Sequence, residues 1–445
     1  MTTDSDGVDL PRDVGAHATT ATYGRAVEQN DGGTTGAGRA SRAHSGTRHQ
    51  NVQRVLEALR LSGPSSQAAL ARRTDLSRAT VNSIVKTLRE QGVAKLMPVN
   101  GRESLVALVS NQGAVVAVQV NVDSLRAALL DFGAGTRLDA AAALRVSDGE
   151  GGGHAGLVLD MVRSLAARAG MQPSDLAGVT VGMQAPLARA TGTVTSWARL
   201  QLPAWKDVVV AETLQDALGA PVFAENDANL AALAEWTWGA GRGSTDFLYV
   251  MCSAGVGGGL IIDGRIHRGG DGLAGEIGHL VLEPSGPVCF CGSRGCLTTF
   301  VSERSILHAL AASGNSLGSL HAVVDGARRG DPACRRVLFE AGRHLGRAFA
   351  STAKVMAPSV VAVGGILGEA GPLVFDGLLS SVEVQSLKMV SPGIRFLPAV
   401  LGDDATLLGG VALALTESGG GASALPEWAR RTHTVRVSND RAHNR

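Results

Sequence analysis

The segment GEIGHLVLEPSGPVCFCGSRGCLTTF, residues 275–300, holds three of the five cysteines of the chain within eight residues, and a histidine precedes them. Thiolate sulfur and imidazole nitrogen are ligands that zinc prefers, and four of them close a tetrahedral shell without an open position. The sequence therefore predicts one structural zinc site with the ligands His279, Cys289, Cys291 and Cys296. The alternative is a group of buried, unligated cysteines beside a histidine of the core.

Length and composition are typical of an α/β protein with two or three domains. The chain has 445 residues, of which 44% are hydrophobic and 18% charged, with a formal net charge of +1. The net charge of the whole chain hides a strongly basic region, because residues 48–102 hold ten Lys or Arg against three Asp or Glu. Such a local excess is typical of a segment that contacts phosphate groups.

The sequence indicates neither a membrane span nor a secretory signal. No apolar run reaches the roughly 18 residues that a spanning helix needs, and the first fifty residues lack the apolar core of a signal peptide. Cys252 and Cys334 stand alone, which favours buried small side chains over a disulfide framework. We therefore expect a cytoplasmic protein that makes no membrane contact.

The patterning divides the chain into four regions. Residues 1–47 are rich in Gly, Thr, Ala and Ser, and we expect them to form a disordered arm. We expect residues 48–110 to form a winged helix-turn-helix and residues 111–416 a two-lobed α/β body. Residues 417–445 begin with a glycine-rich run and carry several arginines, which predicts a flexible basic tail.

Helical periodicity in the second region begins near Asn51, and two further helices are predicted over residues 66–73 and 77–91. Strands over residues 93–97 and 106–109 would form a wing. In a helix-turn-helix, the second helix enters the DNA major groove with its polar and basic side chains. The predicted DNA contacts are therefore Ser77, Arg78, Thr80, Asn82, Ser83, Lys86 and, at the tip of the wing, Arg102. The alternative is a three-helix bundle that contacts another protein.

The third region alternates apolar strands with helical segments. Two strands, at residues 115–120 and 126–132, come before a helix and a strand at residues 178–183, and a second set of strands and helices follows from residue 246. This order favours two lobes with mixed sheets, as in actin-like sugar kinases. A cleft between two such lobes would suit a small ligand.

Three motifs in this region carry a resemblance. They are the histidine–cysteine segment, the loop SAGVGGGLIIDGRIHRG (residues 253–269) and the motif ENDAN (residues 225–229). Together they resemble the ROK family (repressors, open reading frames and sugar kinases), over about residues 51–415. With a winged domain in front, the resemblance implies a transcriptional regulator, usually a repressor of carbohydrate genes. Its partners would be operator DNA, a sugar or sugar phosphate effector, and further copies of itself as a homodimer or homotetramer.

The resemblance also implies site residues. Asp227 matches the general base of family kinases, and the residues that match ligand contacts are Asn226, Asp227, Glu276, His279 and Thr298. The kinases carry DxGGT at their first phosphate loop, where this chain has Gln119, Val120, Asn121, Val122 and Asp123. Lost glycines and an added carboxylate would exclude phosphate, so we expect no kinase activity.

Other readings of the body stay open. One is an ATP-dependent sugar kinase with an appended DNA-binding domain, and another is a body that binds a partner protein. The glycines of residues 255–259, and the pair Gly364 and Gly365, would hold phosphate in a kinase or would serve tight packing here.

Overall fold

A computed structural model of the chain describes residues 51–445 except 53, 57, 60, 61, 63, 91–93, 99–103, 109–112, 145–152, 197, 386–392, 419–424, 431–433 and 437–445. The predicted arm over residues 1–47 and the predicted contact Arg102 lie outside the described residues. In the part of the chain that is described, no helix combines the length and the apolar character needed to cross a bilayer.

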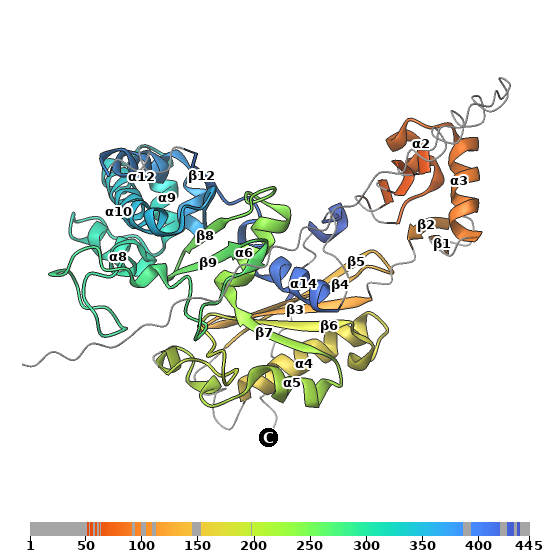
Figure 1. Cartoon of the computed structure of the whole chain (residues 1–445), viewed down its shortest axis with the longest axis horizontal. Helices are drawn as coiled ribbons and strands as arrows, with labels where there is room; N and C mark the ends of the chain where they lie inside the picture. Colours follow the sequence, from red (N-terminus) through yellow and green to blue (C-terminus); the bar gives the residue numbers. More distant parts are fainter. Residues whose placement is uncertain are drawn as a thin grey trace, which may run out of the picture. The chain divides into compact units, whose positions relative to one another are not determined.

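Helices α2 and α3 and a β-hairpin form the winged helix-turn-helix (Figure 1), together with helical residues between Asn51 and Ser62, whose Val55 and Leu59 are buried in the same core. The hairpin strands pair antiparallel, with Ala94 opposite Leu108 and Pro98 opposite Ser104. The elements are α2 (Gln67–Thr74), α3 (Arg78–Glu90), β1 (Ala94–Pro98) and β2 (Ser104–Leu108). The predicted helices and wing are confirmed within one or two residues.

Local hydrogen bonds set the starts of both helices. Ser66 caps α2 by accepting a hydrogen bond from the backbone N–H of Ala69, and the Ser77 hydroxyl accepts one from the N–H of Thr80 at 3.1 Å. Asp75 takes a left-handed conformation in the turn between them. The apolar stripe of α3 is buried, and it consists of Val81, Ile84, Val85 and Leu88.

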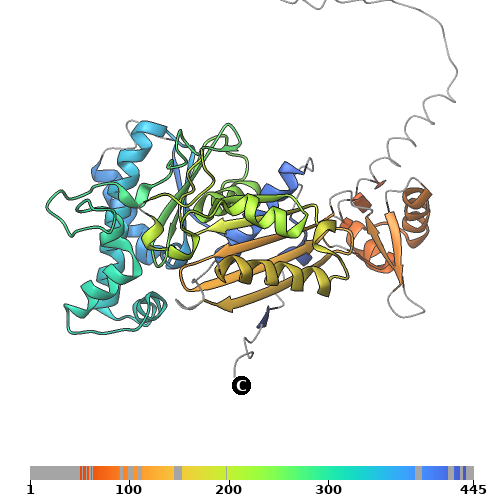
Figure 2. The same ribbon diagram turned by 90° about the horizontal axis from the view of Figure 1, so that it is seen from below.

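The first lobe of the body contains a six-stranded sheet in the order β13-β5-β4-β3-β6-β7. Strands β3, β4 and β5 form an antiparallel meander, and β6 and β7 continue the sheet parallel to β3. The strands are β3 (Ala114–Val120), β4 (Ser124–Asp131), β5 (Thr136–Ala143), β6 (Gly178–Met183), β7 (Val222–Asn226) and β13 (Thr434–Arg436). Helices α4 (Gly153–Arg168) and α5 (Val210–Leu218) cover one face of this sheet (Figure 2). Short 3-10 helices span Pro173–Asp175, Ala198–Leu200 and Pro203–Trp205.

The second lobe contains a five-stranded sheet in the order β10-β9-β8-β11-β12. Its strands are β8 (Phe247–Cys252), β9 (Val256–Ile262), β10 (Arg265–Ile266), β11 (Val360–Gly364) and β12 (Arg395–Pro398). A 3-10 turn (Ile277–His279) follows β10, and helices cover one face of the sheet (Figure 1). These helices are α7 (Thr298–Val301), α8 (Glu303–Ala311), α9 (Leu320–Arg328), α10 (Pro332–Met356), α11 (Gly365–Glu369) and α12 (Pro372–Val384).

Helices α6 (Asp227–Trp238) and α14 (Ala405–Glu417) lie between the two sheets, and a 3-10 turn (Gly402–Asp404) leads into α14. A side chain at Gly409 would overlap the backbone carbonyl of Leu230 in α6. The next residue, Gly410, lies against the first sheet, and its carbonyl accepts a hydrogen bond from the Thr180 hydroxyl at 2.8 Å. These glycines let the backbones approach closely, so α6 is held between the lobes.

Two features of the body differ from the sequence-based expectations. Strand β5 adds a third strand to the predicted pair, although its sequence TRLDAAAA is rich in alanine, which disfavours strands. The prediction of a flexible tail over residues 417–445 is wrong for the segment around the 3-10 helix Glu427–Arg430. Leu425 and Ala429 are buried there, and the Trp428 ring packs edge-on against Phe132 at 5.5 Å. Apolar burial therefore orders this segment.

Replacing Gly409 with alanine should destabilise the body by about 1–3 kcal/mol, because the added methyl group would meet the α6 backbone, which cannot rotate away. Thermal and chemical unfolding would measure this loss. The matched control is Gly156→Ala in α4, where a methyl group meets no atom within 4 Å. The control should be neutral or slightly stabilising, and equal effects of the two substitutions would contradict the packing described here.

Candidate functional site

A cavity of about 410 Å³ opens between the two lobes of the body. Its wall comes from the ends of β3, β7 and β8, the start of α6, the 3-10 turn after β10 and the start of α14. The structure brings together in this wall most of the candidate residues predicted from the sequence, which are Gln119, Asn121, Asp123, Asn226, Asp227, Glu276, His279 and Thr298. Val122 is half-exposed and does not line the cavity.

Asp227 is the first residue of α6 and is 5% exposed. Its neighbour Asn226 caps the helix, accepting hydrogen bonds from the N–H groups of Ala228 and Asn229. The Asp227 carboxylate accepts hydrogen bonds from the Ala228 N–H at 2.8 Å and from the Asn226 amide at 3.2 Å. Burial raises the pKa of Asp227 from 3.8 to about 7, although backbone hydrogen bonds from Ala228 and from Asp227 itself act in the opposite direction. The carboxyl group can thus exchange a proton near neutral pH.

Glu276 and His279 belong to the second lobe and line the same cavity as Asp227. Burial, and secondly the nearby charge of Asp227, raises the pKa of Glu276 to about 7. Burial lowers the pKa of His279. The Nε2 atom of His279 lies 3.9 Å from a carboxylate oxygen of Glu276. Two carboxyl groups and an imidazole therefore face one space, where they can hydrogen-bond to the hydroxyl groups of a ligand.

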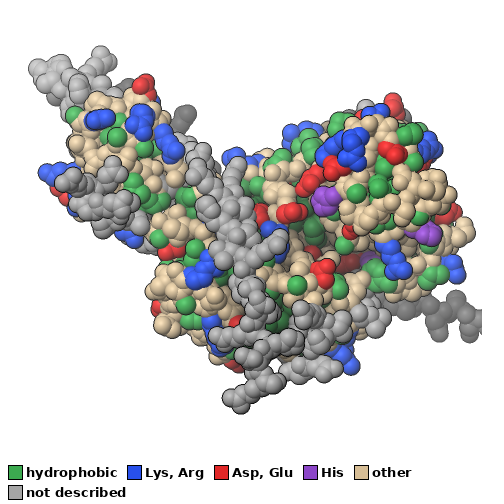
Figure 3. Space-filling view, turned by 180° about the vertical axis from the view of Figure 1, so that it is seen from behind, with side chains coloured by type: hydrophobic (Ala, Val, Ile, Leu, Met, Phe, Trp, Pro, Cys, Tyr) green, Lys and Arg blue, Asp and Glu red, His purple; other side chains and the backbone are tan. Residues whose placement is uncertain are grey.

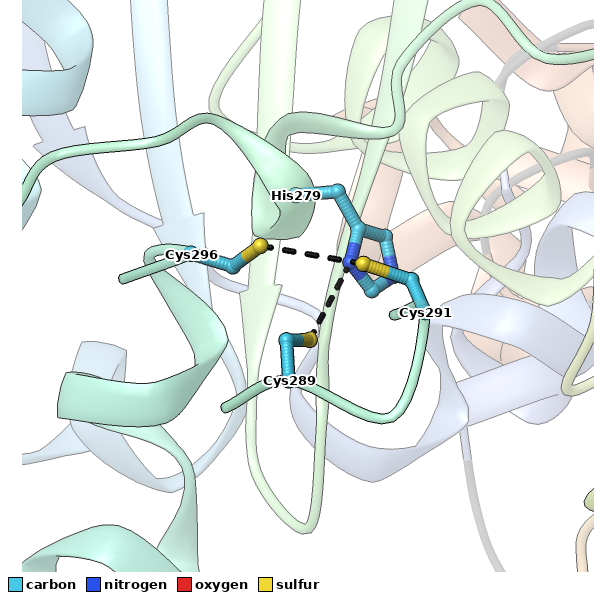
Figure 4. Close-up of side chains that lie close together, drawn as sticks. All are labelled: His279, Cys289, Cys291 and Cys296. Atoms are coloured by element: carbon cyan, nitrogen blue, oxygen red, sulfur yellow. Dashed lines mark hydrogen bonds between the residues drawn. The ribbon is translucent and has the colours of Figure 1, made fainter. Parts of the chain in front are cut away.

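His279, Cys289, Cys291 and Cys296 form a cluster that can hold a metal ion, because their ligand atoms all lie within 4.8 Å of one another. Figure 4 shows the four side chains converging on one point, with the two interactions marked by dashed lines. The Nδ1 atom of His279 lies 3.6 Å from the Cys289 sulfur, and the sulfurs of Cys291 and Cys296 lie 3.7 Å apart. His279 thus belongs both to the cluster, through Nδ1, and to the wall of the cavity.

Two backbone N–H groups in the turn between β3 and β4 already donate hydrogen bonds within the protein and so are not free to bind a phosphate. The N–H of Asn121 donates to the carbonyl of Ser124 at 2.9 Å, and the N–H of Val122 donates to the Gln184 side chain at 3.0 Å. The Asp123 carboxylate accepts a hydrogen bond from the Ser124 hydroxyl. A phosphate-binding loop needs free N–H groups that point at the anion, and this turn does not offer these two.

Three glycines of the second lobe, Gly258, Gly259 and Gly365, have packing roles. A side chain at Gly258 would come within 2.6 Å of the Gly275 carbonyl, and one at Gly259 would meet the backbone of Ala228 in α6. Gly365 has a positive φ of 67° and lies against the Cys252 carbonyl. These contacts support tight packing as the role of these three glycines, whereas Gly255 lines the cavity and has open space around it.

An ion pair beside the cavity was not predicted from the sequence. The buried Glu225 accepts hydrogen bonds from the Asn226 N–H and the Asn229 side chain through one oxygen, and pairs with Arg268 through the other. Glu225 is the second-last residue of β7, and Arg268 follows β10 of the second lobe. The pair therefore fixes Asn226 and Asp227 relative to the loop that leads to Glu276. In the sequence, the one local sign of this ion pair is that an acidic residue, Glu225, directly precedes Asn226 and Asp227.

The outward face of α3 carries exposed polar side chains opposite its buried stripe. Arg78, Asn82, Ser83 and Lys86 are exposed, and Thr80 is partly exposed. Figure 3 shows Lys and Arg side chains on the surface of the winged helix-turn-helix. Exposed basic and polar groups at the start of such a helix are what phosphate and base edges require.

The raised pKa of Asp227 predicts a pH-dependent stability. The unfolded chain ionises this carboxyl group near pH 4 while the folded chain keeps it protonated to about pH 7, so its contribution falls as pH rises between these values. Asp227→Asn cannot ionise. The variant should therefore gain stability relative to the natural protein from pH 4 to pH 8, by up to about 4 kcal/mol. Unfolding curves of both proteins across this range would measure the difference, and a pH-independent difference would contradict the assignment.

Two family models match the sequence. The model of the ROK family matches residues 154–417, and a model of winged helix-turn-helix DNA-binding domains matches residues 48–95. The xylose repressor of Bacillus subtilis (strain 168) is 26% identical over 364 residues, which cover 81% of this chain and 93% of that repressor. The glucokinase of Halalkalibacterium halodurans is 32% identical over 252 residues, which cover 53% of this chain and 76% of the glucokinase.

Solved structures show the same architecture. A ROK hexokinase from Thermus thermophilus is 31% identical, with a TM-score of 0.58 over 69% of this chain and 99% of the hexokinase. A ROK family transcriptional regulator, a homolog of the E. coli MLC protein, superposes with a TM-score of 0.61 at 22% identity over 84% of this chain and 96% of the regulator, and this likeness concerns the fold alone. Because the ROK model spans more than half of the sequence and includes Asp227 and the histidine–cysteine cluster, the chain belongs to the ROK family.

Proposed function

We propose that the protein is a DNA-binding transcriptional repressor of carbohydrate-metabolism genes, and that a sugar bound in the cavity controls its affinity for operator DNA. The observation that carries this proposal is the presence in one chain of a helix with an exposed basic face and of a cavity lined by polar side chains. Xylose repressors are similar along most of the chain, which supports the same combination of roles.

The winged domain would supply the DNA contacts. The exposed face of α3 would enter the major groove, with Arg78 at the start of the helix and Lys86 about two turns further along it. Ser77 caps the helix, so its hydroxyl is already engaged by Thr80, and its role in binding would be to orient Arg78. A homodimer or homotetramer would present these helices to repeated half-sites.

The cavity would supply the sugar contacts. Asn226, Asp227, Glu276, His279 and Thr298 offer several acceptors and donors to a ring of hydroxyl groups. These side chains come from both lobes, so a bound sugar would favour one relative arrangement of the lobes over others. Such a preference is what a ligand needs in order to shift a conformational equilibrium.

Kinase activity is the second candidate, and Asp227 is the observation that favours it. A carboxyl group with a pKa near 7 suits a general base, and glucokinases are among the relatives. Phosphoryl transfer also needs free donors around the phosphate, and the N–H groups of Asn121 and Val122 are already engaged. We therefore propose that the protein is not a kinase.

The histidine–cysteine cluster would hold a structural zinc ion. Zinc–sulfur and zinc–nitrogen bonds of about 2.3 and 2.0 Å imply tetrahedral edges of about 3.8 Å between sulfurs and about 3.5 Å between sulfur and nitrogen. The separations of 3.7 and 3.6 Å agree with these edges. The ion would fix the ring of His279, which also lines the cavity, and so would tie the cluster to the sugar site.

Sequence-specific DNA binding should depend on Arg78. Arg78→Ala should weaken operator binding by about 1–3 kcal/mol, because a groove-facing guanidinium is lost. Titration of fluorescent promoter DNA at several salt concentrations would measure this loss. The matched control is Arg336→Ala, which removes an exposed arginine from α10 of the second lobe. If both variants bound the operator as the natural protein does, α3 would not be the recognition helix.

The protein purified without added metal should contain about one zinc ion per chain by metal analysis. Chelation, or Cys291→Ser, should lower the unfolding midpoint and weaken the sugar response together, because His279 loses its anchor. Cys334→Ser is the control, since Cys334 is buried outside the cluster and its replacement should leave the zinc content unchanged. Full zinc content in Cys291→Ser would contradict the ligand set.

Footprinting of the promoters near the protein's own gene, with and without sugars, would test the proposed function itself. We expect protection of a repeated site that neutral sugars such as D-xylose reduce. Protection that no sugar alters would favour the alternative in which the body binds a partner protein. Phosphorylation of a sugar by ATP at ordinary enzymatic rates would favour the kinase.

A further inference from the structure

One polar group in the cavity wall has no hydrogen-bond partner. The side-chain oxygen Oε1 of Gln119 is buried and accepts no hydrogen bond from any described residue, and the residue is 9% exposed. Gln119 lies on the face of β3 that carries Val115 and Ala117, which is the face packed against α14. A buried acceptor without a hydrogen bond destabilises the folded state by about 1–3 kcal/mol. A ligand that donates a hydrogen bond to this oxygen would remove that penalty.

The surroundings of Gln119 do not suit an anion. Among the described residues that line the cavity, Arg126 is the only Lys or Arg. It is paired with Gln119 across the strands, and its guanidinium donates to the Asp403 carbonyl at 2.7 Å and to the Asp404 carboxylate at 2.9 Å. The carboxyl groups of Asp123 and Asp403 also line the space. A phosphate here would meet negative charge and no uncompensated cation.

The place of Gln119 in the wall is next to the proposed sugar contacts. The hydroxyl of Thr406 donates to the Asp227 carbonyl at 3.3 Å, and its methyl group lies 3.1 Å from where a side chain of Gly182 would begin. Gly182 pairs with Gln119 in the sheet. Gln119, Thr406 and Asp227 all line the same cavity, so one ligand can contact both Asp227 and the unpartnered oxygen.

We propose that the part of the cavity formed by Gln119, Arg126 and Asp403 binds an uncharged, hydroxyl-bearing part of the effector, and that a hydroxyl group donates to Oε1 of Gln119. This inference rests on the proposed function and adds the chemical class of the ligand. A second sugar ring or a hydroxylated substituent would occupy the place where family kinases hold phosphate. Phosphorylated sugars would be excluded, and Gln119 would determine this specificity.

The first test is the stability of the ligand-free protein. Gln119→Met keeps the shape of the side chain and removes the unsatisfied acceptor, so the unfolding midpoint should rise by about 2 °C or more. The matched control is Gln184→Met at the same cavity, because the Gln184 oxygen is occupied by the Val122 N–H. That control should lower the midpoint. If Gln119→Met lowered it as well, the oxygen would already be satisfied and the inference would be overturned.

The second test is effector binding, with the release of promoter DNA as the readout. The probes are D-xylose, D-glucose, xylobiose, cellobiose and glucose 6-phosphate. In the natural protein, the neutral disaccharides should act at the lowest concentrations and the phosphate ester should have no effect. Gln119→Met should raise the disaccharide concentration needed by at least about tenfold, although the variant is the more stable protein.

Failure of this inference can be distinguished from failure of the proposed function. Neutral sugars that release DNA equally from the natural protein and from Gln119→Met would overturn the role of Gln119 and leave the repressor function intact. Tighter binding of glucose 6-phosphate than of glucose would overturn the exclusion of anions. If no neutral probe released DNA, the inference and the sugar control of the proposed function would both fail, while loss of DNA binding in Arg78→Ala would still support the DNA-binding role.

Discussion

The buried carboxyl group of Asp227 is the constraint on which the arrangement of the body depends. The group sits at the first turn of α6, and α6 is held between two sheets because Gly409 lets α14 approach its backbone. Burial makes ionisation costly and raises the pKa of Asp227 to about 7. The cap formed by Asn226 and the pair between Glu225 and Arg268 then fix the position of the carboxyl group. A polar ligand could hydrogen-bond to the polar groups that line this cavity.

The same arrangement explains how a kinase-like body can serve a repressor. The proposed sugar contacts line the cavity from both lobes, so a ligand there could distinguish between arrangements of the lobes. In the turn between β3 and β4, the backbone N–H groups of Asn121 and Val122 donate hydrogen bonds to Ser124 and Gln184. Binding without phosphoryl transfer is sufficient for a switch, provided that the two conformations differ in affinity. The histidine–cysteine cluster would stiffen the wall that carries His279.

Local features were predictable from the sequence, and contacts between distant segments were not. The spacing of the metal ligands and the periodicity of α3 lie within short stretches, and the structure places both as expected. Strand β5 was missed because its alanines do not favour a strand, and its pairing with β4 decides its conformation. The Glu225–Arg268 pair spans 43 residues, and the burial of the unpartnered Gln119 oxygen depends on a strand that packs against the distant helix α14. The buried part of the tail was missed because its apolar residues are few and isolated.

The central claim is that sugar occupancy and operator binding are coupled through one molecule. Coupling of binding free energies is reciprocal, so DNA must change sugar affinity by the factor by which sugar changes DNA affinity. Calorimetric titration of the effective sugar into the protein, alone and saturated with operator DNA, measures this factor directly. The account predicts weaker sugar binding in the presence of operator, by the same factor as the loss of DNA affinity. Equal sugar affinities with and without DNA would contradict it.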